Sequence, residues 1–132
     1  MDTGKKTILL VEDEAILAFI KKQQLEKEGY SVLSVLSGEK ALALFVSGKQ
    51  EIDLVLMDID LGPGIDGIET ALRILDIADV PLLFLSSHTD SEMRERASAV
   101  RHCGYVTKNA HPGMLETLLS DALSRFIPKA QR

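Results

Sequence analysis

The chain has 132 residues, of which 45% are hydrophobic and 27% charged, the balance typical of one globular domain. Its formal net charge of -5 argues against direct binding to nucleic acid, which requires a basic surface. Cys103 is the single cysteine, so no disulfide can form within the chain, and no apolar run is long enough for a signal peptide or a membrane span. We therefore expect one cytoplasmic domain over residues 1–132, with a core from about 7 to 127, a short polar tail at 128–132 and no membrane association.

Short apolar runs alternate with longer amphipathic segments along the whole chain. The runs predict buried strands, because they are too uniformly apolar to have one side in water. They lie at residues 8–11, 32–36, 54–57, 82–85 and 105–106.

The first two amphipathic segments predict helices. After the first run, Leu17, Ile20 and Leu25 recur at helical spacing, and Gly29 ends the segment. The polar side of this helix is formed by Lys21, Lys22, Glu26 and Lys27. The second helix is expected over about 37–46.

The three later helices are predicted from their N-terminal signals. Asp66 is a good N-cap, with Glu69 three residues later as its capping-box partner. Thr89 and Glu92 stand in the same relation, and Pro112 suits a first helical turn. Strand followed by helix, repeated along the chain, predicts a parallel sheet with helices on both faces.

Polar side chains follow four of the five runs, where the strands end. Ligands of open parallel sheets bind beyond this edge. The strings are Glu12-Asp13-Glu14, Asp58-Ile59-Asp60, Ser86-Ser87-His88 and Thr107-Lys108. Converging carboxylates require a cation, and oxygen ligands favour magnesium where a phosphate completes its shell. A carboxylate beside that ion can attack phosphorus to give an aspartyl phosphate, while a lysine and a hydroxyl neutralise the transferred group.

Four strings together resemble the signature of the response-regulator receiver domains of two-component signalling. They are Leu10-Val11-Glu12-Asp13-Glu14, Leu56-Met57-Asp58, Leu85-Ser86-Ser87 and Val106-Thr107-Lys108. Each string alone is weak, but all four stand at strand ends in the family's order, and the resemblance covers residues 7–127. It implies an α/β, flavodoxin-like fold, with a five-stranded parallel sheet in the order 2-1-3-4-5 flanked by five helices.

The resemblance implies a chemical role for each matching residue. Asp58 would be the phosphoacceptor of a phosphorelay, and Lys108 would contact the phosphoryl group. Glu12, Asp13 and Asp58 would bind Mg²⁺ (or Mn²⁺), with the backbone carbonyl of Asp60 as a further ligand. Such a domain catalyses only its own phosphorylation and dephosphorylation, so it is a signalling phosphoacceptor rather than an enzyme.

The resemblance also implies a switch and partners. The hydroxyl of Ser86 would turn toward the phosphoryl group, and Tyr105 would move inward with it. Asp60 and His88 would modulate how long the phosphoryl group lasts. The donor would be a histidine kinase or a histidine phosphotransfer protein, and a homodimer would form through the fourth helix, the fifth strand and the fifth helix.

Three features depart from the family pattern. Asn109 follows the lysine, where proline is usual, so the loop after the fifth strand is expected to have a different shape. The loop at 59–67 is one residue longer than is common, and the acid pair begins with Glu12 rather than aspartate. None of these changes removes a chemical group, so we expect activity to survive.

Other functions stay open at this point. Residues 58–61 resemble the nucleophile motif of haloacid-dehalogenase-type phosphatases, with Asp58 and Asp60 as its acids. That family places metal-binding acids after the lysine, where only Glu116 and Asp121 follow here. An interaction module that is never phosphorylated is a further alternative. Residues 62–67 fit the dinucleotide fingerprint, but neighbouring aspartates would repel a pyrophosphate.

Overall fold

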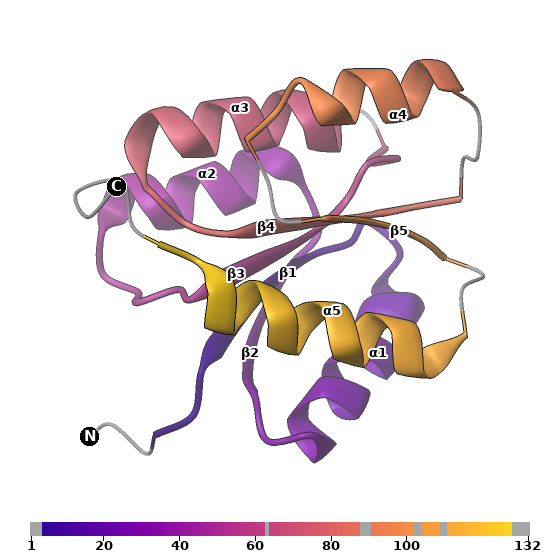
Figure 1. The fold of residues 1–132 in the computed structure, drawn as a ribbon. Coiled ribbons are helices and arrows are strands. Elements are labelled where there is room, and N and C mark those ends of the chain that lie inside the picture. The colour runs from indigo at the N-terminus through magenta and orange to yellow at the C-terminus, as the bar shows by residue number, and fades with distance from the viewer. Residues whose placement is uncertain (1–3, 63, 88–90, 102–103, 109–110, 128–132) are drawn as a thin grey trace.

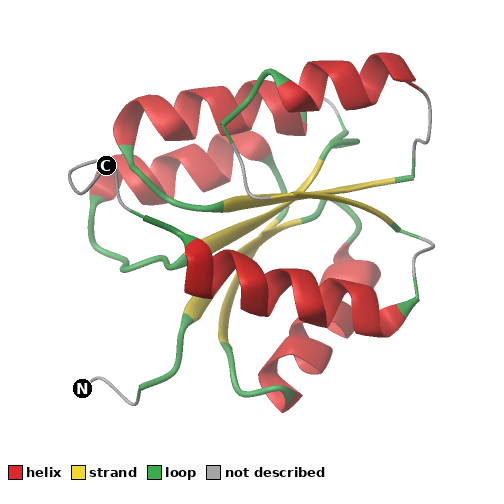
Figure 2. Ribbon diagram, in the orientation of Figure 1, coloured by secondary structure: helices red, strands yellow, loops and turns green. Residues whose placement is uncertain are grey.

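The computed structural model describes residues 4–62, 64–87, 91–101, 104–108 and 111–127. Parallel strands form one sheet in the order β2-β1-β3-β4-β5 (Figures 1 and 2). The strands are β1 (Thr7–Val11), β2 (Ser31–Val35), β3 (Leu54–Asp58), β4 (Leu82–Ser86) and β5 (Gly104–Thr107). The predicted fold class and strand order are therefore confirmed.

Helices cover both faces of the sheet. In the described part of the chain they are α1 (Ala15–Lys27), α2 (Gly38–Ser47), α3 (Gly67–Ile77), α4 (Ser91–Ser98) and α5 (Pro112–Arg125). Figure 1 shows α1 and α5 on one face and α2, α3 and α4 on the other. Among the described residues, no helix has the length and apolar character that crossing a bilayer would need.

The apolar runs are continuous because both faces of the sheet are buried. Side chains alternate between two core layers along each central strand. Leu9, Val55 and Phe84 pack in the layer that contacts α2, α3 and α4. Leu10 and Leu56 pack in the layer beneath α1 and α5. A strand covered on both sides cannot show the polar alternation of a half-exposed strand.

Local capping explains where several helices begin. The Asp66 carboxylate accepts the Glu69 N–H at 2.8 Å, which confirms the predicted N-cap of α3. The Ser37 hydroxyl oxygen accepts the Lys40 N–H at 3.1 Å at the start of α2. α5 begins at Pro112, as predicted. The predicted start of the fourth helix near Thr89 lies outside the described residues.

The inward side of α1 differs from the prediction. Leu25 is buried, but Leu17 is 37% exposed and Ile20 is 45% exposed. The inward stripe instead runs through Ala18, Lys21 and Leu25, whose spacing of three and four residues places them on one side of a helix. The prediction was wrong because it placed Leu17 and Ile20 on the inward side and Lys21 on the polar side, whereas Lys21 has a buried acidic partner.

Candidate functional site

The strand register brings the predicted polar groups to one edge of the sheet. Val11 pairs with Met57, so Glu12 and Asp58 follow or end their strands at the same level. Asp58 pairs with Leu85, one residue before the end of β4. Lys108 directly follows β5, and its backbone N–H donates to the Ser86 carbonyl at 2.7 Å. Acids, hydroxyl and lysine are therefore neighbours in space, although up to 96 positions separate them in the sequence.

Three carboxylates gather at this edge. One oxygen atom each of Glu12, Asp13 and Asp58 lies within 4.8 Å of the other two. Glu12 and Asp58 are each only 1% exposed, and Asp13 is partly exposed. Like charges this close repel one another, and a set of carboxylate oxygens suits a hard divalent cation. The donor set therefore fits magnesium.

Asp58 is held by two hydrogen-bond donors. The Lys108 ammonium donates to Oδ2 at 3.0 Å, and the Asp60 backbone N–H donates to Oδ1 at 3.0 Å. Burial and the neighbouring Glu12 carboxylate raise the pKa of Asp58 to about 7, although Lys108 opposes the rise. A cation in the cluster would favour the ionised form of Asp58, which is the form that can act as a nucleophile.

Glu12 has two lysine side chains as neighbours. Lys21 donates to Oε1 at 3.0 Å, and the Glu14 N–H donates to Oε2 at 3.4 Å. The Lys108 ammonium lies 3.6 Å from the same Oε1. Burial raises the pKa of Glu12, but the adjacent Asp58 carboxyl and the two lysines outweigh burial, so the pKa lies below its ordinary value. Glu12 therefore ionises before Asp58.

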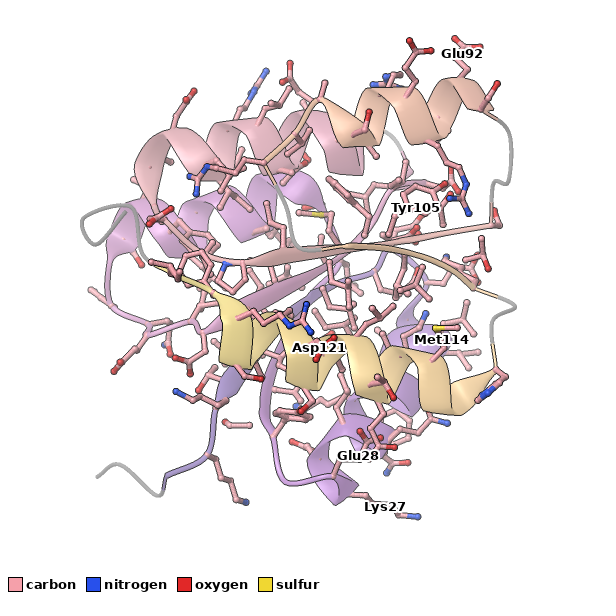
Figure 3. All side chains as sticks on the ribbon, in the orientation of Figure 1. Lys27, Glu28, Glu92, Tyr105, Met114 and Asp121 are labelled. Carbon is pink, nitrogen blue, oxygen red and sulfur yellow. The ribbon has the colours of Figure 1, made fainter. Side chains whose placement is uncertain are left out.

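The predicted switch residues lie on β4, which pairs with β3, and on β5, the next strand of the sheet. Ser86 ends β4 and is fully buried. Tyr105, labelled in Figure 3, is half-buried on β5 beneath α4. The Arg94 guanidinium carbon lies 4.8 Å from the centre of the Tyr105 ring, within the range of a cation–π contact. His88 and Asn109 lie outside the described residues.

Three contacts around the site were not predicted from the sequence. Lys21 pairs with Glu12, and Arg94 covers Tyr105. In addition, a Glu39 carboxylate oxygen on α2 accepts the Ile65 N–H at 3.1 Å and thereby fastens the long loop between β3 and α3. The spacing of Ala18, Lys21 and Leu25 indicates the first contact only once the inward side of α1 is known, and the other two contacts depend on how separate elements pack.

The acids that a phosphatase of the dehalogenase type would use lie elsewhere. Glu116 and Asp121, the latter labelled in Figure 3, are both on α5. Both are exposed. Within the described residues, the carboxylate cluster contains only acids that precede Lys108. The arrangement does not favour the phosphatase alternative.

Known proteins with similar sequences and structures point to one family. The family model for the response regulator receiver domain matches residues 8–120. The transcriptional regulatory protein YvrH of Bacillus subtilis is 32% identical over 120 residues, which are 90% of this chain and 49% of that protein. Putative two-component response regulator ARR19 of Arabidopsis thaliana is 31% identical over 105 residues, which are 80% of this chain and 26% of that protein. The chain thus spans about half the length, or less, of these curated relatives.

Solved structures resemble the chain over most of its length. The N-terminal domain of a response regulator/sensory box/GGDEF 3-domain protein from Carboxydothermus hydrogenoformans is 43% identical, with a TM-score of 0.82 and coverage of 90% of this chain and 94% of that one. Response regulator protein TrrA from Thermotoga maritima, solved in complex with Mg²⁺-BeF, is 31% identical, with a TM-score of 0.78 and coverage of 89% and 99%.

Proposed function

The chain belongs to the response regulator receiver domain family, and we propose that it accepts a phosphoryl group onto Asp58 in a magnesium-dependent reaction. The observation that carries the proposal is the position of the buried Asp58 carboxylate, which lies between the Lys108 ammonium and the acids Glu12 and Asp13. A nucleophile, a cation site and a fixed positive charge are the components that phosphoryl transfer requires.

The chain's own residues supply the following steps. Glu12, Asp13, Asp58 and the backbone carbonyl of Asp60 would hold Mg²⁺, or Mn²⁺ with the same oxygen ligands. When bound, the ion neutralises oxygens of the transferred group. An Asp58 oxygen attacks phosphorus as the bond from phosphorus to the donor's histidine nitrogen breaks, and the histidine leaves. Lys108, already 3.0 Å from Asp58 Oδ2, stabilises the negative charge on the phosphoryl oxygens.

Phosphorylation would then bias a two-state equilibrium. The new oxygens at Asp58 are acceptors for the Ser86 hydroxyl and for Lys108. In the structure Lys108 is engaged with Asp58 itself, and Tyr105 is only half-buried under Arg94. We expect Tyr105 to become more buried when Ser86 turns toward the phosphoryl group, and α4 to shift with it. His88 and Asp60 would influence the lifetime of this state.

The partners follow from the same chemistry. The donor would be a phosphohistidine on a histidine kinase or a histidine phosphotransfer protein, and a small acyl phosphate can replace it in vitro. Activation is expected to promote a weak homodimer through α4, β5 and α5, where Met114 is 46% exposed. Sedimentation that shows only monomers with and without a beryllofluoride phosphoryl mimic would reject this dimer.

Intact mass spectrometry after incubation with acetyl phosphate tests the proposal. We expect a single phosphoryl adduct that forms with magnesium, does not form when EDTA is present from the start, and does not form on Asp58→Asn. Asp53→Asn is a matched control, since Asp53 lies before β3 and caps the β1 backbone by accepting the Thr7 N–H at 2.7 Å. An adduct that persists in Asp58→Asn would place the phosphoacceptor elsewhere. No adduct, with rapid hydrolysis of a generic phosphomonoester instead, would favour the phosphatase. Absence of both would favour an interaction module that is never phosphorylated.

A further inference from the structure

Two lysines converge on one oxygen of Glu12. Lys21 Nζ lies 3.0 Å from Glu12 Oε1, and Lys108 Nζ lies 3.6 Å from the same atom. The role of Lys108 follows from its second contact, with Asp58. Lys21 has no part in the chemistry proposed above. Its position against a carboxylate that is only 1% exposed therefore calls for a separate explanation.

The fold directs Lys21 inward. Ala18 and Leu25, one turn before and one turn after it on α1, are both buried, and the Lys21 side chain itself is only 19% exposed. Lys21 also lines, together with Lys108 and His111, a cavity of about 430 Å³ between α1 and α5. A lysine that is mostly buried in this way, with its ammonium on a buried acid, is not a solvated surface charge.

The charges of the cluster have a direct consequence for a cation. Glu12, Asp13 and Asp58 bring three negative charges when ionised, and Lys21 and Lys108 bring two positive charges. A divalent cation that uses Glu12, directly or through a bound water, must compete with Lys21 for Oε1. The other oxygen of Glu12 already accepts the Glu14 N–H at 3.4 Å. Glutamate reaches one methylene further than aspartate, which suits an acid that must contact both the cluster and α1.

We propose that Lys21 is a positioning residue that holds Glu12 toward α1 and thereby weakens magnesium binding, so that it sets the magnesium concentration at which the site fills. This inference rests on the proposed function, because it assumes that the carboxylate cluster is the magnesium site. It assigns to Lys21 a role that acts through Glu12, without contact with the phosphoryl group.

Magnesium affinity, measured by isothermal titration calorimetry on the whole chain, tests the inference. Lys21→Met removes the competing charge and keeps the aliphatic stem, so we expect magnesium to bind on the order of five- to tenfold more tightly than to the unsubstituted chain. Lys21→Arg keeps the charge and should stay within about twofold of the unsubstituted chain. Lys22→Met is the matched control, since it removes the same charge from the adjacent residue, which forms no ion pair with the described residues.

A second measurement separates positioning from a general loss of structure. Phosphorylation by acetyl phosphate, followed by intact mass, should be faster in Lys21→Met at low magnesium and equal to the unsubstituted chain at saturating magnesium. A variant that is merely misfolded would lose rate at every magnesium concentration and would also bind magnesium more weakly.

The outcomes distinguish the inference from the proposed function. Tighter magnesium binding in Lys21→Met alone supports the inference. Unchanged or weaker binding in Lys21→Met overturns it, and so does an equal gain in Lys22→Met, because net charge alone would then explain the effect. If the unsubstituted chain binds no magnesium, the magnesium-dependent function fails and the inference fails with it.

Discussion

The residues around the carboxylate cluster and those around Tyr105, the proposed switch residue, differ greatly in how deeply they are buried. Every residue of β3 is buried, and the acids Glu12 and Asp58 are each 1% exposed. On β5, by contrast, only Val106 is buried, and on α4 only Ala97 is buried among the described residues. The two buried acids thus lie on or directly after strands that are almost wholly buried, whereas Tyr105 lies on a strand, and beneath a helix, with few buried residues.

This difference explains how one small domain can serve two purposes. A nucleophile and its cation site need fixed geometry, which dense packing around β1 and β3 supplies. A switch needs two arrangements that differ by little free energy, which is easier to achieve where few groups are buried. Besides the apolar contacts of Ala97 and Met93, two polar contacts hold α4: Arg94 lies over Tyr105, and Arg96 pairs with Asp66 at 3.0 Å.

The largest effect is expected from a matched pair of methionines. Met57 on β3 is fully buried, and Met93 on α4 is partly buried against the same core layer. Met57→Ala leaves a cavity in the core layer that contacts α2, α3 and α4, and should lower the free energy of unfolding by about 2–5 kcal/mol, whereas Met93→Ala should lower it by about 1 kcal/mol or less. Urea unfolding followed by circular dichroism measures both. Equal losses at the two positions would contradict the comparison.

A smaller effect, and one that depends on pH, is expected at Asp58. The unfolded-state pKa of this carboxyl is near 3.8, and burial beside Glu12 raises the folded-state pKa to about 7. The folded chain therefore binds more protons than the unfolded chain between these values, so the contribution of Asp58 to stability is fully present below pH 3.8 and is lost as pH rises through 7.

Asp58→Asn removes this dependence. Without magnesium, we expect the variant to be more stable than the unsubstituted chain by on the order of 3 kcal/mol above pH 7, and the difference to shrink toward pH 4. Urea unfolding in EDTA from pH 5 to 8 checks this, and titration of the other carboxyls largely cancels in the comparison. Magnesium should reduce the difference, since it favours ionised Asp58. A difference that does not vary with pH would show that Asp58 is not perturbed in this way.

The buried strand β3 and the start of α3 are also well predicted from the sequence. The β3 run is uniformly apolar and ends in Asp58, and the Asp66 cap is a local signal, so both can be recognised from a few consecutive residues. The meeting of Asp58 with Lys108 was predicted because the carboxyl ends of parallel strands share one edge of the sheet, whereas the order of the strands required the family resemblance in addition.

The predictions that failed or were missing concern side chains whose partners are distant in the sequence. α1 carries apolar residues on more than one side, including Ile16 and Phe19, which are 76% and 60% exposed, so periodicity alone could not choose the inward face. The pairing of Lys21 with Glu12 becomes visible only once that face is known. The contact between Arg94 and Tyr105 depends on how α4 docks on the sheet, which no local pattern encodes.

The smallest effect on stability is expected at the contact between Arg94 and Tyr105. Arg94→Ala removes the cation over the Tyr105 ring and should lower the free energy of unfolding by about 0.5–1 kcal/mol, since the contact is partly exposed. Arg94→Lys keeps the charge but not the planar group that stacks on the ring, and should have an intermediate effect. The chain has two tyrosines and no tryptophan, so Tyr30→Phe leaves Tyr105 as the only emitter for fluorescence.

Quenching of Tyr105 fluorescence by acrylamide then relates the contact to switching. In the unphosphorylated state, Arg94→Ala should make Tyr105 more accessible to the quencher. With magnesium and beryllofluoride, Tyr105 is expected to move inward and away from Arg94, so the variant and the unsubstituted arginine should give the same, lower accessibility. If the difference between them persists after activation, then Arg94 stays on the Tyr105 ring in both states. The inward movement of Tyr105 would then be contradicted.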